Sequence, residues 1–359
     1  MINVTKTYIP SLEEFTFQIK RAFENGWLTN RGPLVKELEC VLHNKFRLNQ
    51  SSLLCLNNGT IPLQIALKLL GNEGEIITTP FSYVATTSSI VWEKCTPIFV
   101  DIHPEYLTID ETKIEEAITD KTTCILATHV FGNPCDVDAI ERIAKKHNLK
   151  VIYDAAHCFG VEYNSKSIFE YGDLSTCSFH STKIFHTGEG GAIFCKDSNL
   201  FQKIFYSHNF GHSSETEFYG LGINAKMSEI HAALGLTIIK HIDDIFIKRK
   251  NVVTFYDLNI DFSKVRKIKI RELTNWNYSY YPVIFKNETQ LNVVLNKLND
   301  AKVFPRRYFY PSLNTLNYVD YTKCIISEET SSKILCLPLF VGIDEKDLKL
   351  ICEIINQNI

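Results

Sequence analysis

Two side chains of opposite charge follow neighbouring apolar runs in the middle of the chain. Asp154 directly follows the run Val151–Tyr153, and Lys183 comes just after a second run, Cys177–Phe179. Short apolar runs bounded by Gly, Asp and Ser are typical of buried strands, so both groups are expected near strand ends. An aspartate can keep the ring nitrogen of pyridoxal phosphate (PLP) protonated, so that the ring acts as an electron sink, and a lysine can form a Schiff base with its aldehyde. The pair therefore predicts a PLP site.

Taken singly, these residues have ordinary structural explanations. An aspartate at a strand end often caps a turn, and a lysine in a loop is usually solvated. The combined pattern is more specific: D-A-A-H at 154–157, S-F-H-S-T-K at 178–183 and G-E-G-G at 188–191. This set resembles the PLP segment of the nucleotide-sugar aminotransferases, a branch of the fold-type-I, aspartate aminotransferase-like superfamily.

The resemblance implies a role for four residues of this segment. Lys183 would be the catalytic residue, carrying the cofactor and moving protons as general base and acid. Asp154 would contact the cofactor ring nitrogen, His157 would lie near its phenolic oxygen, and Ser178 would bind its phosphate. Some relatives are sugar 3-dehydratases with histidine at the lysine position, so the lysine found here favours transamination.

Further cofactor contacts are expected outside this segment. The strand expected at 53–56 runs into N-N-G-T, and a helix with proline in its first turn follows. A helix N-terminus after small polar residues is a suitable anion site, and the family places the PLP phosphate here, implying contacts from Gly59 and Thr60. Family members stack an aromatic residue on the PLP ring at the position of Tyr83, for which ordinary core packing is the alternative. The resemblance also implies that Asn224 reaches the phosphate of a neighbouring subunit.

Substrate contacts are expected from three other segments. Thr29 and Asn30 lie in W-L-T-N-R-G-P, a motif that the family places near the sugar-nucleotide site. His186 lies close to the catalytic lysine in sequence and is expected to shape the sugar pocket. Arg307 and Tyr308 lie in F-P-R-R-Y-F-Y-P, where arginine beside aromatics suits a nucleotide diphosphate. A subunit interface explains this last motif equally well.

The composition is that of an ordinary globular protein. The chain has 359 residues, 45% hydrophobic and 22% charged, with a net charge of −3, which gives no reason to expect nucleic-acid or membrane-surface binding. No apolar stretch could span a bilayer, and no basic-then-apolar leader precedes the first motif. The 11 cysteines lack metal-type spacing, so we expect reduced thiols, a cytoplasmic protein and no metal site.

The elements that position these residues predict an α/β fold. Apolar runs alternate with helical patterns from 53 to 195, which favours a mostly parallel sheet with helices on both faces, the fold-type-I arrangement that the resemblance implies. We expect a large PLP domain with its N-terminal segment at 1–249 and a small C-terminal α+β domain at 250–359. Outside the sheet, helices are predicted at 11–25, 33–46, 111–119, 137–147, 289–299 and 344–355.

The resemblance also implies an activity. The expected reaction moves an amino group from L-glutamate to a keto group of a nucleotide-linked deoxysugar. The motif H-V-F-G-N-P-C-D at 129–136, together with the PLP segment, looks like enzymes acting at C4 of dTDP-4-keto-6-deoxyglucose for lipopolysaccharide (O-antigen) biosynthesis. The alternatives are a 3-keto-sugar or a UDP- or GDP-linked 4-keto-sugar, and a non-catalytic PLP-binding regulator. A homodimer with shared active sites is expected.

Overall fold

Seven strands form the central sheet of the computed structural model, which describes all residues 1–359. Strand β10 is antiparallel to both of its neighbours, and all other adjacent strands are parallel. The mostly parallel α/β sheet predicted from the sequence is therefore confirmed. In spatial order the strands are β2 (Ser52–Leu56), β10 (Gly191–Cys195), β9 (Leu174–Ser178), β6 (Lys150–Asp154), β5 (Thr122–Thr128), β3 (Glu75–Thr78) and β4 (Thr96–Phe99).

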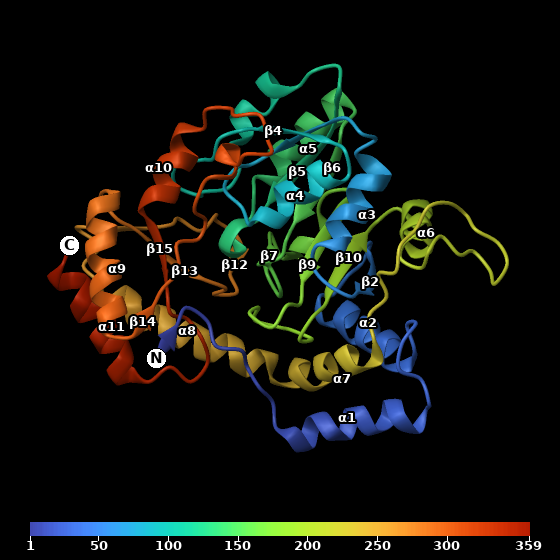
Figure 1. Cartoon of the computed structure of the whole chain (residues 1–359), viewed down its shortest axis with the longest axis horizontal. Coiled ribbons are helices and arrows are strands. Elements are labelled where there is room, and N and C mark those ends of the chain that lie inside the picture. Colours follow the sequence, from blue (N-terminus) through green and yellow to red (C-terminus); the bar gives the residue numbers. More distant parts are fainter.

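Helices cover both faces of this sheet (Figure 1). Side chains alternate between the faces of a strand, and in β2 Leu53 and Cys55 join one core cluster while Leu54 and Leu56 join the other. Both sets are buried, which explains why the strands appear as unbroken apolar runs in the sequence. The first cluster includes α2 (Pro33–Lys45), α5 (Val137–His147) and α7 (Glu229–Ile238), and the second includes α3 (Ile61–Leu70), α4 (Val84–Trp92) and α6 (Ser198–Ser207).

The C-terminal part of the chain builds a second, smaller core. Its antiparallel sheet consists of β11 (Arg266–Lys267), β13 (Tyr281–Ile284) and β15 (Ile334–Leu337). Around it lie α8 (Ile242–Asn259), α9 (Glu288–Asp300), α10 (Ile325–Lys333) and α11 (Glu345–Gln357). The remaining short strands are β7 (Glu162–Tyr163), β8 (Lys166–Ser167), β12 (Thr274–Asn275) and β14 (Val303–Phe304).

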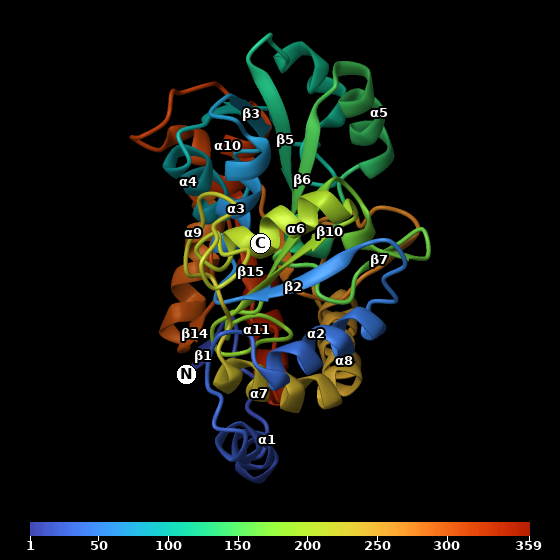
Figure 2. The same cartoon turned by 90° about the vertical axis from the view of Figure 1, so that its right-hand side faces the viewer.

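The N-terminal segment connects the two cores. Strand β1 (Ile2–Asn3) pairs in parallel with β14, in the C-terminal part of the chain. The chain then reaches α1 (Leu12–Glu24), which packs beside α7 (Figure 2). The domain division at 249/250 stays a prediction, and that point lies inside α8. The first turns of α8, with Ile242 and Ile245, join the core under the large sheet, while Val252 and Tyr256 join the C-terminal core.

The predicted helices agree with the structure within two residues, with one exception. The segment 111–119 contains two short 3₁₀ turns, Glu111–Lys113 and Glu115–Ala117, in place of the predicted helix. So short a segment gains little from helical propagation after nucleation, and this explains the difference. No helix of the structure is both long and apolar enough to cross a membrane.

Candidate active site

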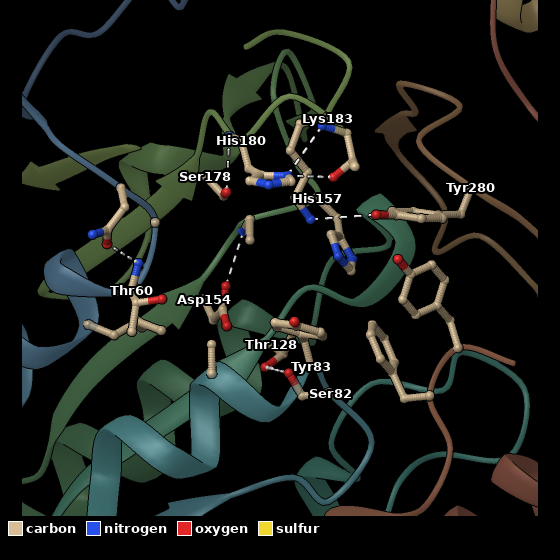
Figure 3. Close-up of a pocket in the computed structure, with 18 of the residues that line it drawn as sticks. Thr60, Ser82, Tyr83, Thr128, Asp154, His157, Ser178, His180, Lys183 and Tyr280 are labelled. Carbon is tan, nitrogen blue, oxygen red and sulfur yellow. Dashed lines mark hydrogen bonds between the residues drawn. The ribbon is translucent and has the colours of Figure 1, made fainter. Parts of the chain in front are cut away.

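The largest group of predicted site residues lies around one cavity at the carboxyl edge of the large sheet. The cavity has a volume of about 310 Å³, within the range of roughly 300–1,000 Å³ usual for small-molecule sites. Strands β2, β6 and β9 point the same way and all end at this edge, so residues far apart in sequence meet there. The predicted residues that line it are Gly59 and Tyr308, together with Thr60, Tyr83, Asp154, His157, Ser178 and Lys183, which are labelled in Figure 3.

Asp154 is the last residue of β6 and is buried. Its Oδ1 accepts a hydrogen bond from the Ala156 N–H at 3.1 Å, and its Oδ2 accepts one from the Thr86 hydroxyl at 2.7 Å. Burial raises the pKa of Asp154, while these two hydrogen bonds and the charge of Lys183 act in the opposite direction. The carboxylate is thus fixed in orientation at the cavity wall.

Lys183 lies in the turn that follows β9, and its N–H donates to the His180 carbonyl at 2.8 Å. Its Nζ reaches to 3.5 Å from the Tyr280 hydroxyl (Figure 3). Burial lowers the pKa of Lys183 from its ordinary value, and nearby Tyr308 and Asp154 oppose the shift. A lowered pKa increases the fraction of neutral amine, the form that can act as a nucleophile or a base.

His157 is a buried, neutral imidazole. Burial, followed by the charge of Lys183, holds the pKa of His157 well below its usual range. Its Nδ1 accepts a hydrogen bond from the Phe131 N–H at 3.1 Å. Because a neutral imidazole has one N–H, the proton of His157 resides on Nε2, which makes that nitrogen a hydrogen-bond donor.

A second part of the cavity borders the start of α3. The Asn58 Oδ1 accepts hydrogen bonds from the N–H groups of Thr60 and Ile61, both at 2.9 Å, and holds the first turn of α3 in place. A Cβ atom added to Gly59 would lie 2.6 Å from the Ser178 Cβ, so this close approach requires glycine. A helix N-terminus and the hydroxyls of Thr60 and Ser178 therefore border the same space.

Tyr83 is the N-cap residue of α4, and its side chain is 50% exposed. It lines the cavity, so ordinary core packing does not account for its position. An aromatic face at this wall is suited to stacking against a flat ring.

Two predicted substrate residues lie outside the cavity. The His186 Nε2 is 2.8 Å from the Tyr8 carbonyl oxygen, where it anchors the N-terminal segment. The Arg307 guanidinium pairs with Glu288 at 2.7 Å and donates to the Ser332 carbonyl at 2.8 Å. Both side chains have structural partners, and neither lines the cavity.

Thr29, Asn30 and Asn224 also do not line the cavity of their own chain. All three are exposed to solvent. The structure brings them neither to Lys183 nor into one of the pockets that lie against it.

The cavity contains Tyr280, which the sequence reasoning missed, and Arg306, the neighbour in the same motif of the predicted Arg307. Tyr280 lies beside an apolar strand and resembles core sequence. The backbone of Arg306 forms an antiparallel β-bridge with the backbone of Cys336. In such an extended segment consecutive side chains point to opposite sides. This alternation could have indicated that only one of the two neighbouring arginines faces the site.

The residues present fit PLP. The cavity combines an aromatic wall, a lysine, a buried carboxylate and a helix start flanked by the hydroxyls of Thr60 and Ser178, and Gly59 leaves room where a side chain would intrude. No group of three or more His, Cys, Asp or Glu side chains is arranged to hold a metal ion. Fold and site together define the class of PLP-dependent transferases with an aspartate aminotransferase-like fold.

The chain belongs to the DegT/DnrJ/EryC1/StrS aminotransferase family, whose model matches residues 11–356. It is therefore an aminotransferase, and its cofactor is pyridoxal phosphate. The resemblance inferred from the motifs is confirmed.

Named relatives match over nearly the whole chain. The dTDP-4-amino-4,6-dideoxy-D-glucose transaminase of Shigella dysenteriae is 41% identical and covers 99% of this chain and 98% of the relative. The GDP-perosamine synthase of Escherichia coli O157:H7 is 30% identical, with 94% of each chain covered. The crystal structure of DesI in the presence of its TDP-sugar product superposes with a TM-score of 0.93 at 27% identity, covering 99% of this chain and 92% of DesI.

Proposed function

We propose that this aminotransferase moves an amino group from L-glutamate to C4 of dTDP-4-keto-6-deoxyglucose, giving dTDP-4-amino-4,6-dideoxyglucose. The main support for this substrate assignment is the 41% identity, over 99% of the chain, to a transaminase named for that product. The motifs at 129–136 and 178–183 point to the same substrate. We further propose that the product serves lipopolysaccharide (O-antigen) biosynthesis in the cytoplasm.

The residues of the cavity would hold the cofactor at several points. Asp154 would face the ring nitrogen, Tyr83 would stack on the ring, and the Nε2–H of His157 would donate to the phenolic oxygen. Gly59, Thr60 and Ser178 would receive the phosphate, together with the first turn of α3. Bound in this way, PLP supplies an electron sink.

Lys183 would carry out the proton transfers. Its neutral amine would act as the general base that takes the proton from the donor α-carbon, and then as the general acid that gives this proton up again, while bound PLP would supply the electron sink. Burial favours this neutral form because it lowers the pKa of Lys183. In the second half-reaction Lys183 would move a proton in the opposite direction, ending at C4 of the sugar.

Arg306 would bind an anionic group of the substrates. It lines the cavity and stacks on the Tyr308 ring, with its Cζ 4.3 Å from the ring centroid. Unlike Arg307, it forms no ion pair with a carboxylate of the protein, so its charge remains available. Arg306 thus takes the place of Arg307 in the proposed substrate site, and Tyr308 keeps its place there.

We also propose a homodimer with shared active sites. The segment after α6 projects from the body of the molecule (Figure 1) and carries the exposed apolar side chains of Phe218, Tyr219 and Leu221. Such a surface is costly to leave in water and is typical of an interface. Thr29, Asn30 and Asn224, which do not line their own cavity, would then contact the site of the partner subunit.

The substrate is tested with purified protein, L-glutamate and dTDP-4-keto-6-deoxyglucose, with the product structure solved by NMR. An amine at C4 is the expected result. If glutamate converts the bound cofactor to its amine form but this sugar gives no product, the aminotransferase activity is supported and the proposed sugar substrate is wrong. The GDP-linked 4-keto-6-deoxysugar would be tested next, because the 30% identity to a GDP-perosamine synthase favours it as the second candidate, and 3-keto and UDP-linked sugars would follow.

A further inference from the structure

Three buried hydroxyl groups form a chain that ends on Asp154. The Thr128 hydroxyl donates to the Ser82 Oγ at 3.1 Å, and the Ser82 and Thr86 oxygens are 2.7 Å apart. The Thr86 hydroxyl donates to the Asp154 Oδ2 at 2.7 Å. The exposed fractions of Thr86, Ser82 and Thr128 are 0%, 1% and 3%, so all three hydroxyls are buried, with Ser82 and Thr128 at the wall of the cavity.

The three residues of this hydrogen-bonded hydroxyl chain come from different parts of the fold. Thr86 lies in the first turn of α4, and Ser82 lies just before that helix. Thr128 is the last residue of β5 and is paired in register with Asp154, the last residue of β6. Figure 3 shows Ser82 and Thr128 beneath Asp154, on the side of the cavity where α4 begins.

The direction of the hydrogen bonds follows from proton counting. A hydroxyl has one proton, and Thr86 gives its proton to Asp154 because an ionised carboxylate can only accept. Ser82 must then donate to Thr86, and Thr128 donates to Ser82. All three protons therefore point toward the carboxylate, and each bond polarises the next in the same sense.

This arrangement opposes the effect of burial on Asp154. Burial favours the neutral acid. The groups that face the carboxylate and favour its ionised form are the side chain of Lys183 when it is charged, the N–H of Ala156 and the Thr86 hydroxyl. Thr86 is the one of these whose donor strength is increased by further buried hydroxyls.

We propose that Thr86, Ser82 and Thr128 are positioning residues that keep Asp154 ionised, so that it holds a proton on the ring nitrogen of the cofactor. This inference rests on the role proposed for Asp154 above. Without the chain the carboxylate would be a stronger base and would draw the proton from the ring nitrogen to itself. The ring would then be a poorer electron sink.

The test is the ¹⁵N chemical shift of the ring nitrogen in protein reconstituted with ring-¹⁵N-labelled PLP. We expect a pyridinium shift in the wild type and a move toward the neutral pyridine value in Thr86→Val. Ser82→Ala and Thr128→Val should follow with progressively smaller moves. The kcat of Thr86→Val should fall about tenfold, the scale of one hydrogen bond to a charged group, and Thr86→Ser should restore both values.

Thr87→Val is the matched control. Thr87 is the next residue of the same helix, equally buried, and its Oγ1 has no hydrogen-bond partner. The Thr87→Val variant should leave the ¹⁵N shift at the wild-type value, whereas a shift equal to that of Thr86→Val would overturn the proposal. A wild-type shift in both Thr86→Val and Ser82→Ala would overturn it as well.

Asp154→Asn separates this inference from the function on which it rests. If that variant gives a neutral ring nitrogen while the variants of Thr86, Ser82 and Thr128 do not, Asp154 has the proposed role and the three hydroxyls do not. If Asp154→Asn keeps a pyridinium shift, the role of Asp154 is wrong, and the proposed role of the chain is overturned with it.

Discussion

The hydroxyl of Tyr280 lies 3.5 Å from the Nζ of Lys183, across 97 positions of sequence. Tyr280 precedes β13 of the C-terminal core, and Lys183 follows β9 of the large sheet. Burial raises the pKa of Tyr280, which keeps the phenol protonated. The small core thus contributes a hydrogen-bonding partner to the lysine that is proposed to move protons.

Tyr280→Phe should lower kcat about tenfold and leave cofactor binding intact, because the amine of Lys183 loses a fixed partner. Stopped-flow spectroscopy of the conversion by glutamate measures this rate. Tyr281→Phe is the control: the Tyr281 hydroxyl faces the other way and bonds to Asp257 at 2.6 Å. The Tyr281→Phe variant should lower the melting temperature and leave kcat unchanged. Equal losses of kcat in both variants would contradict the role of Tyr280.

Lys183→Ala should abolish amino transfer while PLP still binds, since the remaining residues that line the cavity are unchanged. Borohydride reduction followed by mass spectrometry should show covalently attached cofactor in the wild type and none in the variant. Substantial turnover by Lys183→Ala would rule out the assignment of this lysine.

Arg306→Ala and Arg307→Ala should have different effects. Arg306 faces the cavity, so its loss should raise KM for glutamate or for the sugar nucleotide at least tenfold. Arg307 pairs with Glu288, and its loss should instead lower the melting temperature with KM within about twofold of the wild type. Steady-state kinetics and thermal unfolding of both variants check this. A raised KM in Arg307→Ala with an unchanged KM in Arg306→Ala would show that Arg307, and not Arg306, binds the substrate.

Asp154→Asn should stabilise the cofactor-free protein at pH 8 while it removes activity. Burial raises the pKa of Asp154 in the folded state, so its ionisation destabilises that state at every pH above the folded-state pKa. The penalty disappears below the ordinary aspartate pKa of about 3.9, where both folded and unfolded chains are protonated. The gain in melting temperature should therefore shrink as pH falls from 8 toward about 4. A gain that is independent of pH would have another cause.

A mixture of two inactive variants tests the shared sites. Lys183→Ala and Asn224→Ala should each be inactive or weak alone. Refolded together, they should recover about a quarter of wild-type activity, because half of the dimers are hybrids and each hybrid holds one complete site. Size-exclusion chromatography confirms the oligomeric state, and no recovery in verified hybrids would place Asn224 outside the partner's site.

The sequence pattern predicted the fold and the position of Asp154 for a physical reason, and the family motifs supplied most of the other cavity residues. A buried parallel strand must be apolar on both faces, so a charged or hydroxyl residue at its end stands out. Asp154 was recognisable in this way as the last residue of β6, whereas Ser178, the last residue of β9, was assigned from the family motif. Their common edge then follows from the parallel arrangement.

Side-chain direction was harder to predict. His186 and Arg307 lie within the correct motifs, but the first bonds to the carbonyl of Tyr8 and the second to Glu288. Both partners are remote in sequence from the catalytic segment. Thr86 likewise carried no signal in the sequence, since its contact with Asp154 depends on how α4 packs against the end of β6. Pairing between distant segments is not encoded in any local pattern.

The pairing of β1 with β14 has a consequence for the order in which the chain is made. Synthesis begins at the N-terminus, so Ile2 and Asn3 leave the ribosome long before their partners Val303 and Phe304 exist. All seven strands of the large sheet, which end at Cys195, can assemble in the meantime. Ile2 and Asn3 therefore reach their final place late, after Val303 and Phe304 have been made, whereas α1 can pack on α7 earlier.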